Sequence, residues 1–171
     1  MSGDGRRRVR AVVLSDTHIR TGGRRRLPGP VVEALADADV VLHAGDVLDA
    51  DVLDALAESA PVHAVLGNND DGLVGRLPER LEVTLAGVKV GMVHDSGSAK
   101  GREARMRRWF PDADVVVFGH SHIPWDAPGE DGQWLFNPGS PTDRRPQPNH
   151  TFGLLEFEEG QLVDHRIVVA D

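Results

Sequence analysis

The sequence contains no cysteine, and this absence removes several kinds of chemistry at once. Disulfides, thiolate zinc sites and cysteine nucleophiles are excluded, so any transition-metal ligands must be imidazole, carboxylate or amide groups. No apolar run has the length of a membrane span, and no cleavable leader is expected, because the apolar residues 9–14 run directly into Ser15-Asp16. We therefore expect a cytoplasmic protein without a membrane partner.

Positive charge is also scarce. The 19 Lys and Arg residues are outnumbered by 27 Asp and Glu, which gives a formal net charge of −8. Nonspecific affinity for nucleic acid comes from Lys and Arg side chains that neutralise phosphates. A nucleic-acid partner is therefore not favoured, although a local basic patch would permit one.

The length of 171 residues predicts one domain, residues 1–171, large enough to bury roughly two thirds of the surface of the unfolded chain. Residues 1–8 are expected to form a disordered arm. The sequence contains no internal repeat and no stretch typical of a domain linker.

Apolar runs alternate with helical patterns in the first half of the chain. Runs rich in Val and Leu, typical of strands buried on both faces, predict strands over residues 9–15, 40–46 and 62–66. Amphipathic helices are predicted between them, over 30–38 and 49–59. This alternation indicates an α/β fold with parallel pairing and right-handed crossovers.

The second half is expected to be largely antiparallel. Hairpins are predicted over 81–93, around Ala86-Gly87, and over 151–169, around Glu159-Gly160. Between them the sequence predicts a basic helix over 98–109, a buried strand over 113–118 and short extended segments at 124–126 and 133–136.

Polar residues follow five apolar runs where each strand is predicted to end. These residues are Asp16-Thr17-His18, Gly45-Asp46, Gly67-Asn68-Asn69-Asp70, His94-Asp95 and Gly119-His120-Ser121-His122. If the strands lie side by side, their carboxyl ends form one rim, where these side chains converge. We interpret the rim as a site for two metal ions bridged by Asp46. Nitrogen and oxygen ligands together suit Mn, Fe, Zn, Co or Ni better than Ca.

The spacing within two of these motifs carries further information. In an extended backbone, Asp16 and His18 point the same way and can reach one ion. His120 and His122 follow the same rule, but after the turn opened by Gly119 their imidazoles could instead serve neighbouring ions.

Each motif alone has a simpler explanation. Asp-x-His and Gly-Asp are common in turns and caps, and a lone histidine at a strand end is usually exposed or hydrogen-bonded. The full series, in this order and at strand ends, favours a metal site. Elsewhere, the arginines of 102–108 are interpreted as a solvated face. His63, His150 and His165 are interpreted as structural or exposed, and His43 as a partner that orients a ligand.

Taken together, the motifs resemble the calcineurin-like metallophosphoesterase superfamily over about residues 9–169. The small size and the segment Phe136–Ser140 resemble its compact bacterial and archaeal phosphodiesterase branch, which also contains a retromer subunit. The resemblance implies a four-layer α/β/β/α sandwich, with two mixed β-sheets packed face to face and helices flanking them. It also implies one ion bound by Asp16, His18, Asp46 and His122, and a second bound by Asp46, Asn68, His94 and His120.

Two positions depart from the pattern of the family. Many relatives place a histidine after Gly-Asn, where it meets the phosphate, whereas this chain has Asn69. An amide can hydrogen-bond to a phosphoryl oxygen but cannot deliver a proton as an acid. We therefore assign Asn69 as a catalytic contact to the phosphate and expect a preference for good leaving groups. Asp95 stands where relatives often carry glycine, and it adds negative charge near the rim.

These residues predict a phosphodiesterase that depends on two divalent ions, with Mn expected and Fe, Zn, Ni or Co as alternatives. The hypothesis is in-line attack by a metal-bridging hydroxide on a small phosphodiester. Two other functions stay open: a non-catalytic metal-bound scaffold like the retromer subunit, and a phosphomonoesterase or nuclease. Self-association into a homo-oligomer is expected by family analogy alone.

Overall fold

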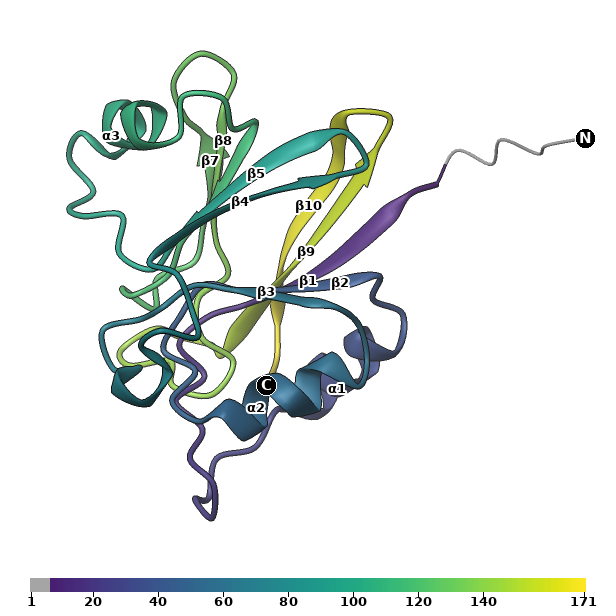
Figure 1. Ribbon diagram of the computed structural model, residues 1–171, viewed down its shortest axis with the longest axis vertical. Helices are drawn as coiled ribbons and strands as arrows, with labels where there is room; N and C mark the ends of the chain where they lie inside the picture. Colours follow the sequence, from purple (N-terminus) through teal and green to yellow (C-terminus); the bar gives the residue numbers. More distant parts are fainter. Residues whose placement is uncertain (1–6) are drawn as a thin grey trace, which may run out of the picture.

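Two five-stranded β-sheets pack against each other in a computed structural model that describes residues 7–171 (Figure 1). The first sheet has the strand order β10 (Gln161–Val169), β9 (Thr151–Glu158), β1 (Val9–Leu14), β2 (Val40–His43) and β3 (Val62–Ala64). The second has the order β4 (Arg80–Leu85), β5 (Val88–Val93), β6 (Val115–Val117), β8 (Trp134–Asn137) and β7 (Trp125–Pro128).

The helices lie on the outer sides of the two sheets. Figure 1 shows α1 (Gly29–Ala36) and α2 (Ala50–Ala57) together beside the first sheet, and α3 (Arg102–Trp109) beside the second. A short 3-10 turn, η1 (Asp71–Leu73), follows β3. None of the helices in the described part of the chain is long and apolar enough to cross a membrane.

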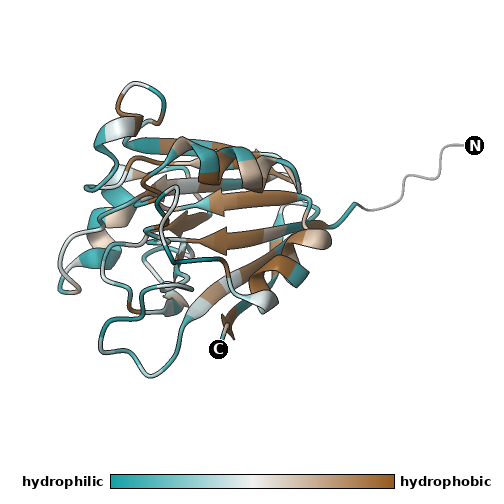
Figure 2. Cartoon of the chain, turned by 90° about the horizontal axis from the view of Figure 1, so that it is seen from below, coloured by the Kyte–Doolittle hydropathy of each residue, from teal (hydrophilic) through white to brown (hydrophobic). Residues whose placement is uncertain are grey.

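Three apolar clusters fill the spaces between these four layers. In β1, Val12 and Leu14 join the cluster that includes residues of α1 and α2, whereas Ala11 and Val13 join the cluster between the sheets. Val116 of β6 belongs to the third cluster, which includes Met106 of α3. Successive strand residues therefore serve opposite faces. Figure 2 shows the strands as largely hydrophobic. The predicted four-layer α/β/β/α sandwich is confirmed.

Strand pairing agrees with the sequence in the first half and only in part in the second. The pairs β1–β2 and β2–β3 are parallel, as predicted. In the second half, β4–β5, β7–β8 and β9–β10 are antiparallel, as predicted, whereas β5–β6 and β6–β8 are parallel. Parallel neighbours need a long crossover, which α3 provides between β5 and β6 and the segment with β7 provides between β6 and β8.

The ends of the elements also differ from the prediction in places. The predicted helix over 98–109 begins only at Arg102, because Gly101 has a left-handed backbone with φ 76° that a helix does not continue. At the N-terminus, residues 1–6 of the expected arm lie outside the described residues. Arg8 forms ion pairs with Glu156 at 2.9 Å and Glu158 at 3.4 Å.

Candidate metal centre

The predicted ligands all follow the carboxyl ends of strands, but the strands belong to two sheets. β1, β2 and β3 of the first sheet precede Asp16, Asp46 and Asn68, and β5 and β6 of the second precede His94 and His120. The condition considered from the sequence, that all five strands lie side by side, is therefore not met within one sheet. The side chains converge because the corresponding edges of the two sheets meet.

Hydrogen bonds join the two sheets at this edge. His94 Nδ1 donates to the Ala44 carbonyl at 2.7 Å, and the His120 backbone N–H donates to Asp16 Oδ2 at 3.0 Å. Each bond connects a loop of the second sheet to a loop of the first. The relative position of the ligands is thus fixed by backbone groups as well as by the core between the sheets.

Five of the seven predicted ligands have a left-handed backbone. The φ angles are 55° at Asp16, 47° at His18, 59° at Asp46, 71° at His120 and 61° at His122. This conformation is uncommon in residues other than glycine, and such strain clusters at functional sites. The assumption of an extended backbone at Asp16 and His18 is therefore wrong, although their side chains still approach each other.

The first group consists of the residues that the family resemblance implies for one ion. His18 Nε2 lies 3.8 Å from Asp16 Oδ1 and 3.3 Å from Asp46 Oδ2. His122 Nε2 lies 3.4 Å from Asp16 Oδ1. The donor atoms of Asp16, His18 and His122 all lie within 4.8 Å of one another, a spacing that one metal ion can span.

The second group lies beside the first. His94 Nε2 is 2.9 Å from Asn68 Oδ1 and 3.5 Å from Asp46 Oδ2. His120 Nδ1 is 3.2 Å from Asn68 Oδ1 and 3.3 Å from His94 Nε2. His120 and His122 therefore join different groups, which is the second of the two arrangements considered from the sequence. The two groups share the Asp46 carboxylate.

Backbone carbonyls orient two of the histidines. His94 Nδ1 donates to the Ala44 carbonyl, and His122 Nδ1 donates to the Asp143 carbonyl. A carbonyl only accepts, so each Nδ1 carries the proton and each Nε2 presents its lone pair to the centre. Such a partner usually fixes the tautomer of a metal-binding histidine.

Three buried polar atoms in this arrangement indicate whether it fits a metal ion. Asp16 Oδ1, His18 Nε2 and His122 Nε2 have no hydrogen-bond partner among the described residues. Buried polar atoms without partners are rare and costly. These three belong to one group of donor atoms, so a divalent ion would satisfy them together. The donor set fits a metal.

Charge at the centre favours ionised carboxylates. Burial acts to raise the pKa of Asp16, but its contacts with His122 and His18 outweigh burial, and the pKa lies well below its ordinary value. Burial acts to lower the pKa of His122, but the adjacent Asp16 raises it overall. Because a metal needs neutral imidazole, metal binding competes with protons at His122.

Asp70 supports the site in a way that the sequence analysis did not identify. Its buried carboxylate accepts backbone N–H bonds from Asp46 at 2.9 Å, Leu48 at 2.8 Å and Gly67 at 2.8 Å. The loops after β2 and β3 are thereby joined around one side chain. The available signal was a carboxylate three residues after Gly67, a local spacing that also occurs in turns.

A distant segment also holds the loop after β1. Ser140 Oγ donates to the Asp16 carbonyl at 2.8 Å, and Thr142 Oγ1 donates to the Thr17 carbonyl at 2.6 Å. Ser15 Oγ donates to Asp16 Oδ2 at 2.6 Å. The sequence gives no signal for the contacts of Ser140 and Thr142, because more than 120 residues separate the partners.

His43 lies beneath the site. The Gly45 N–H donates to its Nδ1 at 3.2 Å, and its Nε2 lies 3.0 Å from Thr17 Oγ1. Nδ1 must therefore accept, which fixes the neutral tautomer with the proton on Nε2. His43 contacts the loops that carry Asp16 and Asp46.

This environment predicts a pH-dependent stability. Burial lowers the pKa of His43 to about 4 from 6.5, so the unfolded chain binds the proton more tightly than the folded one. Stability is therefore lost as pH falls from 6.5 towards 4, by about 2 kcal/mol at pH 5. In urea unfolding with chelator, we expect His43→Gln to lose about 2 kcal/mol less than the wild type between pH 7 and pH 5. Parallel losses in both proteins would contradict this prediction.

Asn69 and Asp95 border the centre. Asn69 is exposed, and its Nδ2 donates to Asp46 Oδ2 at 2.8 Å. It is therefore close to the carboxylate that both groups share, while its contact with a phosphate stays a prediction. Asp95 lies 3.8 Å from His120 Nε2 through its Oδ2.

The arginines of α3 do not simply form a solvated face, because three of them are held by hydrogen bonds. Arg102 is buried and donates to Ser96 Oγ at 2.9 Å. Arg105 donates to the Ser96 carbonyl at 2.6 Å, and Arg107 donates to the Pro111 carbonyl at 2.9 Å. These side chains stabilise the surroundings of the helix. Of the remaining histidines, His150 contacts Asp171 and His165 contacts Asp126.

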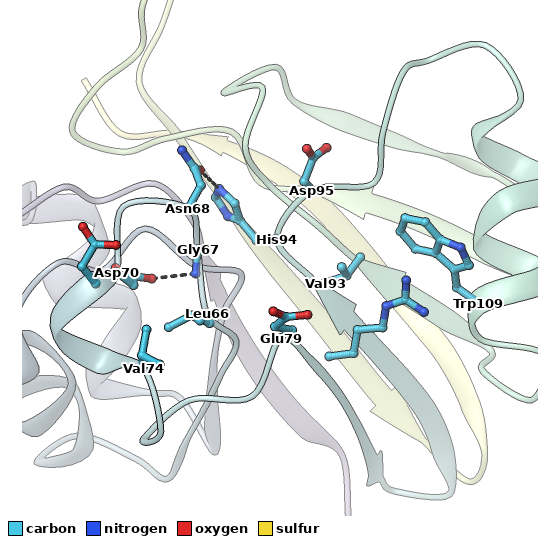
Figure 3. Close-up of a pocket in the computed structure, with 12 residues that line it drawn as sticks. Leu66, Gly67, Asn68, Asp70, Val74, Glu79, Val93, His94, Asp95 and Trp109 are labelled. Atoms are coloured by element: carbon cyan, nitrogen blue, oxygen red, sulfur yellow. Dashed lines mark hydrogen bonds between the residues drawn. The ribbon is translucent and has the colours of Figure 1, made fainter.

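A cavity of about 450 Å³ opens from the second group of ligands (Figure 3). Figure 3 shows Asp70 and Val74 on one side of the cavity and Trp109 on the other, with Asn68 and His94 between them. Arg80 stacks on the Trp109 ring at 4.0 Å. Four acidic residues also line the cavity: Asp70, Asp71, Glu79 and Asp95.

Comparison with known proteins gives a consistent result. The calcineurin-like phosphoesterase superfamily domain matches residues 9–160 of this chain. A probable metallophosphoesterase of Methanothermobacter thermautotrophicus is 36% identical over 132 residues, which cover 76% of each chain. The matched range 9–160 includes all seven predicted metal ligands.

Solved structures share the fold at lower identity. Vacuolar protein sorting 29 of Cryptosporidium parvum has a TM-score of 0.75 at 22% identity, with 94% of this chain and 97% of that chain covered. The same protein from Entamoeba histolytica, solved in complex with zinc, has a TM-score of 0.71 at 23% identity, with coverage of 95% and 100%.

Proposed function

Because the chain belongs to the calcineurin-like phosphoesterase superfamily, we propose that it is a phosphodiesterase that uses two divalent metal ions. The probable metallophosphoesterase relatives support a hydrolase of phosphoric esters, and the chain carries a fitting set of metal-ligating residues. The number of ions, their identity as Mn and the preference for diesters belong to the proposal. Cytoplasmic location and self-association stay predictions.

One observation carries the proposal: two groups of ligands meet at a shared carboxylate. Asp46 Oδ2 lies 3.3 Å from His18 Nε2 in one group and 3.5 Å from His94 Nε2 in the other. A residue with two carboxylate oxygens suits a bridge between neighbouring ions. When bound, two such ions offset the charge of the phosphate and lower the pKa of water to about 7.

The residues of the chain provide position and charge. Asp16 stays ionised, and backbone carbonyls hold His94 and His122 in the tautomer that presents Nε2. The His120 side chain is 43% exposed, so the second group is open to a substrate from solvent. Asn69 extends beside Asp46, where its amide can donate to a phosphoryl oxygen but cannot protonate a leaving group. Esters with good leaving groups are therefore the preferred substrates.

The test compares a diester with the matching monoester. With Mn added, we expect bis(4-nitrophenyl) phosphate to be cleaved faster than 4-nitrophenyl phosphate, and a chelator to abolish both reactions. Elemental analysis should find about two metal ions per chain. Faster cleavage of the monoester would indicate a phosphomonoesterase. Two bound ions without cleavage of either ester would favour the metal-bound scaffold.

A further inference from the structure

A second cavity opens from the other side of the centre, beside the first group of ligands. It has a volume of about 320 Å³ and is lined by His18, Arg20, Gly23, Arg24, Arg25 and Leu48. Three of these six residues are arginines, in a chain with a net charge of −8. Because His18 belongs to the candidate metal centre, the cavity adjoins the place where a phosphate would react.

Arg25 connects this cavity to the predicted ligand His18 and to Asp143, which contacts the predicted ligand His122. Its Nη1 donates to the His18 carbonyl at 3.4 Å, and its Nη2 lies 3.3 Å from Asp143 Oδ2. The Asp143 carbonyl in turn accepts from the ligand His122. The loop that carries Arg24 and Arg25 is therefore attached to the candidate metal centre.

Arg24 and Arg20 have guanidinium N–H groups that can still donate hydrogen bonds to a ligand. Arg24 forms no hydrogen bond or ion pair with any residue from 7 to 171, and Arg20 interacts electrostatically with Asp49. The Asp49 carboxylate already accepts a hydrogen bond from the Thr21 N–H at 2.5 Å. A guanidinium group without a carboxylate partner, as at Arg24, is suited to phosphate, which it binds through paired hydrogen bonds.

The opposite cavity has the reverse charge. Four acidic residues line it, Asp70, Asp71, Glu79 and Asp95, against the single arginine Arg80. An anionic group next to the reacting phosphate is therefore repelled from the side of His94 and attracted to the side of His18. This difference in charge favours one orientation of a bound substrate, in which its additional anionic group lies on the side of His18.

We propose that the cavity formed by His18, Arg20, Arg24 and Arg25 binds a second phosphate of the substrate. The inference rests on the proposed phosphodiesterase function and narrows its substrates to small diesters that carry a further phosphate on one arm. A small molecule fits better than a nucleic acid, because the arginines surround one cavity of about 320 Å³ and the chain as a whole is acidic.

The experiment compares two substrates with the same leaving group. Thymidine 5′-(4-nitrophenyl phosphate) lacks a second phosphate, and its 3′-phosphorylated form has one. In the Mn-loaded protein we expect the 3′-phosphate to raise kcat/KM about tenfold, mainly through KM. Arg24→Gln should reduce this ratio to about one, and Arg24→Lys should restore part of it. The matched control is Arg108→Gln, which removes the same charge at an exposed position of α3 and should leave both rates unchanged.

A binding measurement separates this inference from the proposed function. Calorimetry should detect binding of thymidine 3′,5′-bisphosphate, about tenfold weaker in Arg24→Gln than in Arg108→Gln. If neither ester is cleaved, the proposed function fails, and this binding difference alone decides the inference. Equal affinity in the two variants, or no effect of the 3′-phosphate on kcat/KM, would overturn it. Tighter binding of single-stranded oligonucleotides with increasing length would also overturn it, in favour of a nucleic-acid groove.

Discussion

Replacement of Asp46 by asparagine should lower turnover of an activated phosphodiester by more than about a hundredfold, the upper range for loss of a residue that only supports a ligand. The Asp46 carboxylate is buried and lies between His18 and His94, one from each group of ligands. Asparagine keeps the shape of the side chain but removes the charge and one acceptor oxygen. Both ions should therefore bind more weakly, which elemental analysis and turnover with Mn would measure.

The matched control is Asp54→Asn on α2. Asp54 is exposed and pairs with Arg76 at 2.9 Å at the surface, so the same chemical change should leave metal content and turnover as in the wild type. Asp46→Asn with wild-type turnover and two ions per chain would contradict the bridging role. Loss of both properties in Asp54→Asn would instead indicate a general effect of the lost charge.

The sequence predicted well which side chains follow strand ends and converge, because their signals are local. A run such as VVLH identifies a buried strand, and the first polar residues after it lie at the carboxyl end of that strand. This logic placed Asp16, Asp46 and His94 correctly at strand ends without any knowledge of which strands are neighbours. It did not predict which strands share a sheet, because the pattern of one strand does not specify the sheet to which that strand belongs.

Long-range contacts explain what else could not be predicted. The hydroxyl of Thr142 holds the Thr17 carbonyl across 125 positions of sequence, and nothing near either residue indicates the other. The left-handed backbone at Asp16 and His120 is also imposed from outside, since Asp16 Oδ2 accepts the N–H of His120 from the opposite sheet. Tertiary contacts here maintain backbone conformations that local preference disfavours.

Gly67→Ala should disrupt the centre without any change to a ligand. A Cβ atom at Gly67 would lie 2.9 Å from Asp46 Cα and closer still to the Asp46 backbone nitrogen and Oδ1. The backbone cannot easily move apart, because Asp70 Oδ2 accepts the N–H groups of both Gly67 and Asp46. Overpacking of this kind costs about 1–3 kcal/mol, and here the displaced group is the shared carboxylate. We expect reduced stability in urea and loss of metal binding together.

Gly72→Ala provides the control for this substitution. Gly72 lies in η1, five residues further along the same loop, and a Cβ there would meet no atom within 4 Å. This variant should retain its metal content and keep or slightly increase its stability, because alanine restricts the unfolded chain more than glycine does. If Gly67→Ala bound two ions with wild-type affinity, the close packing of the loops after β2 and β3 would not be what positions Asp46. If both variants lost metal, the cause would be general weakening of the loop rather than overlap at Asp46.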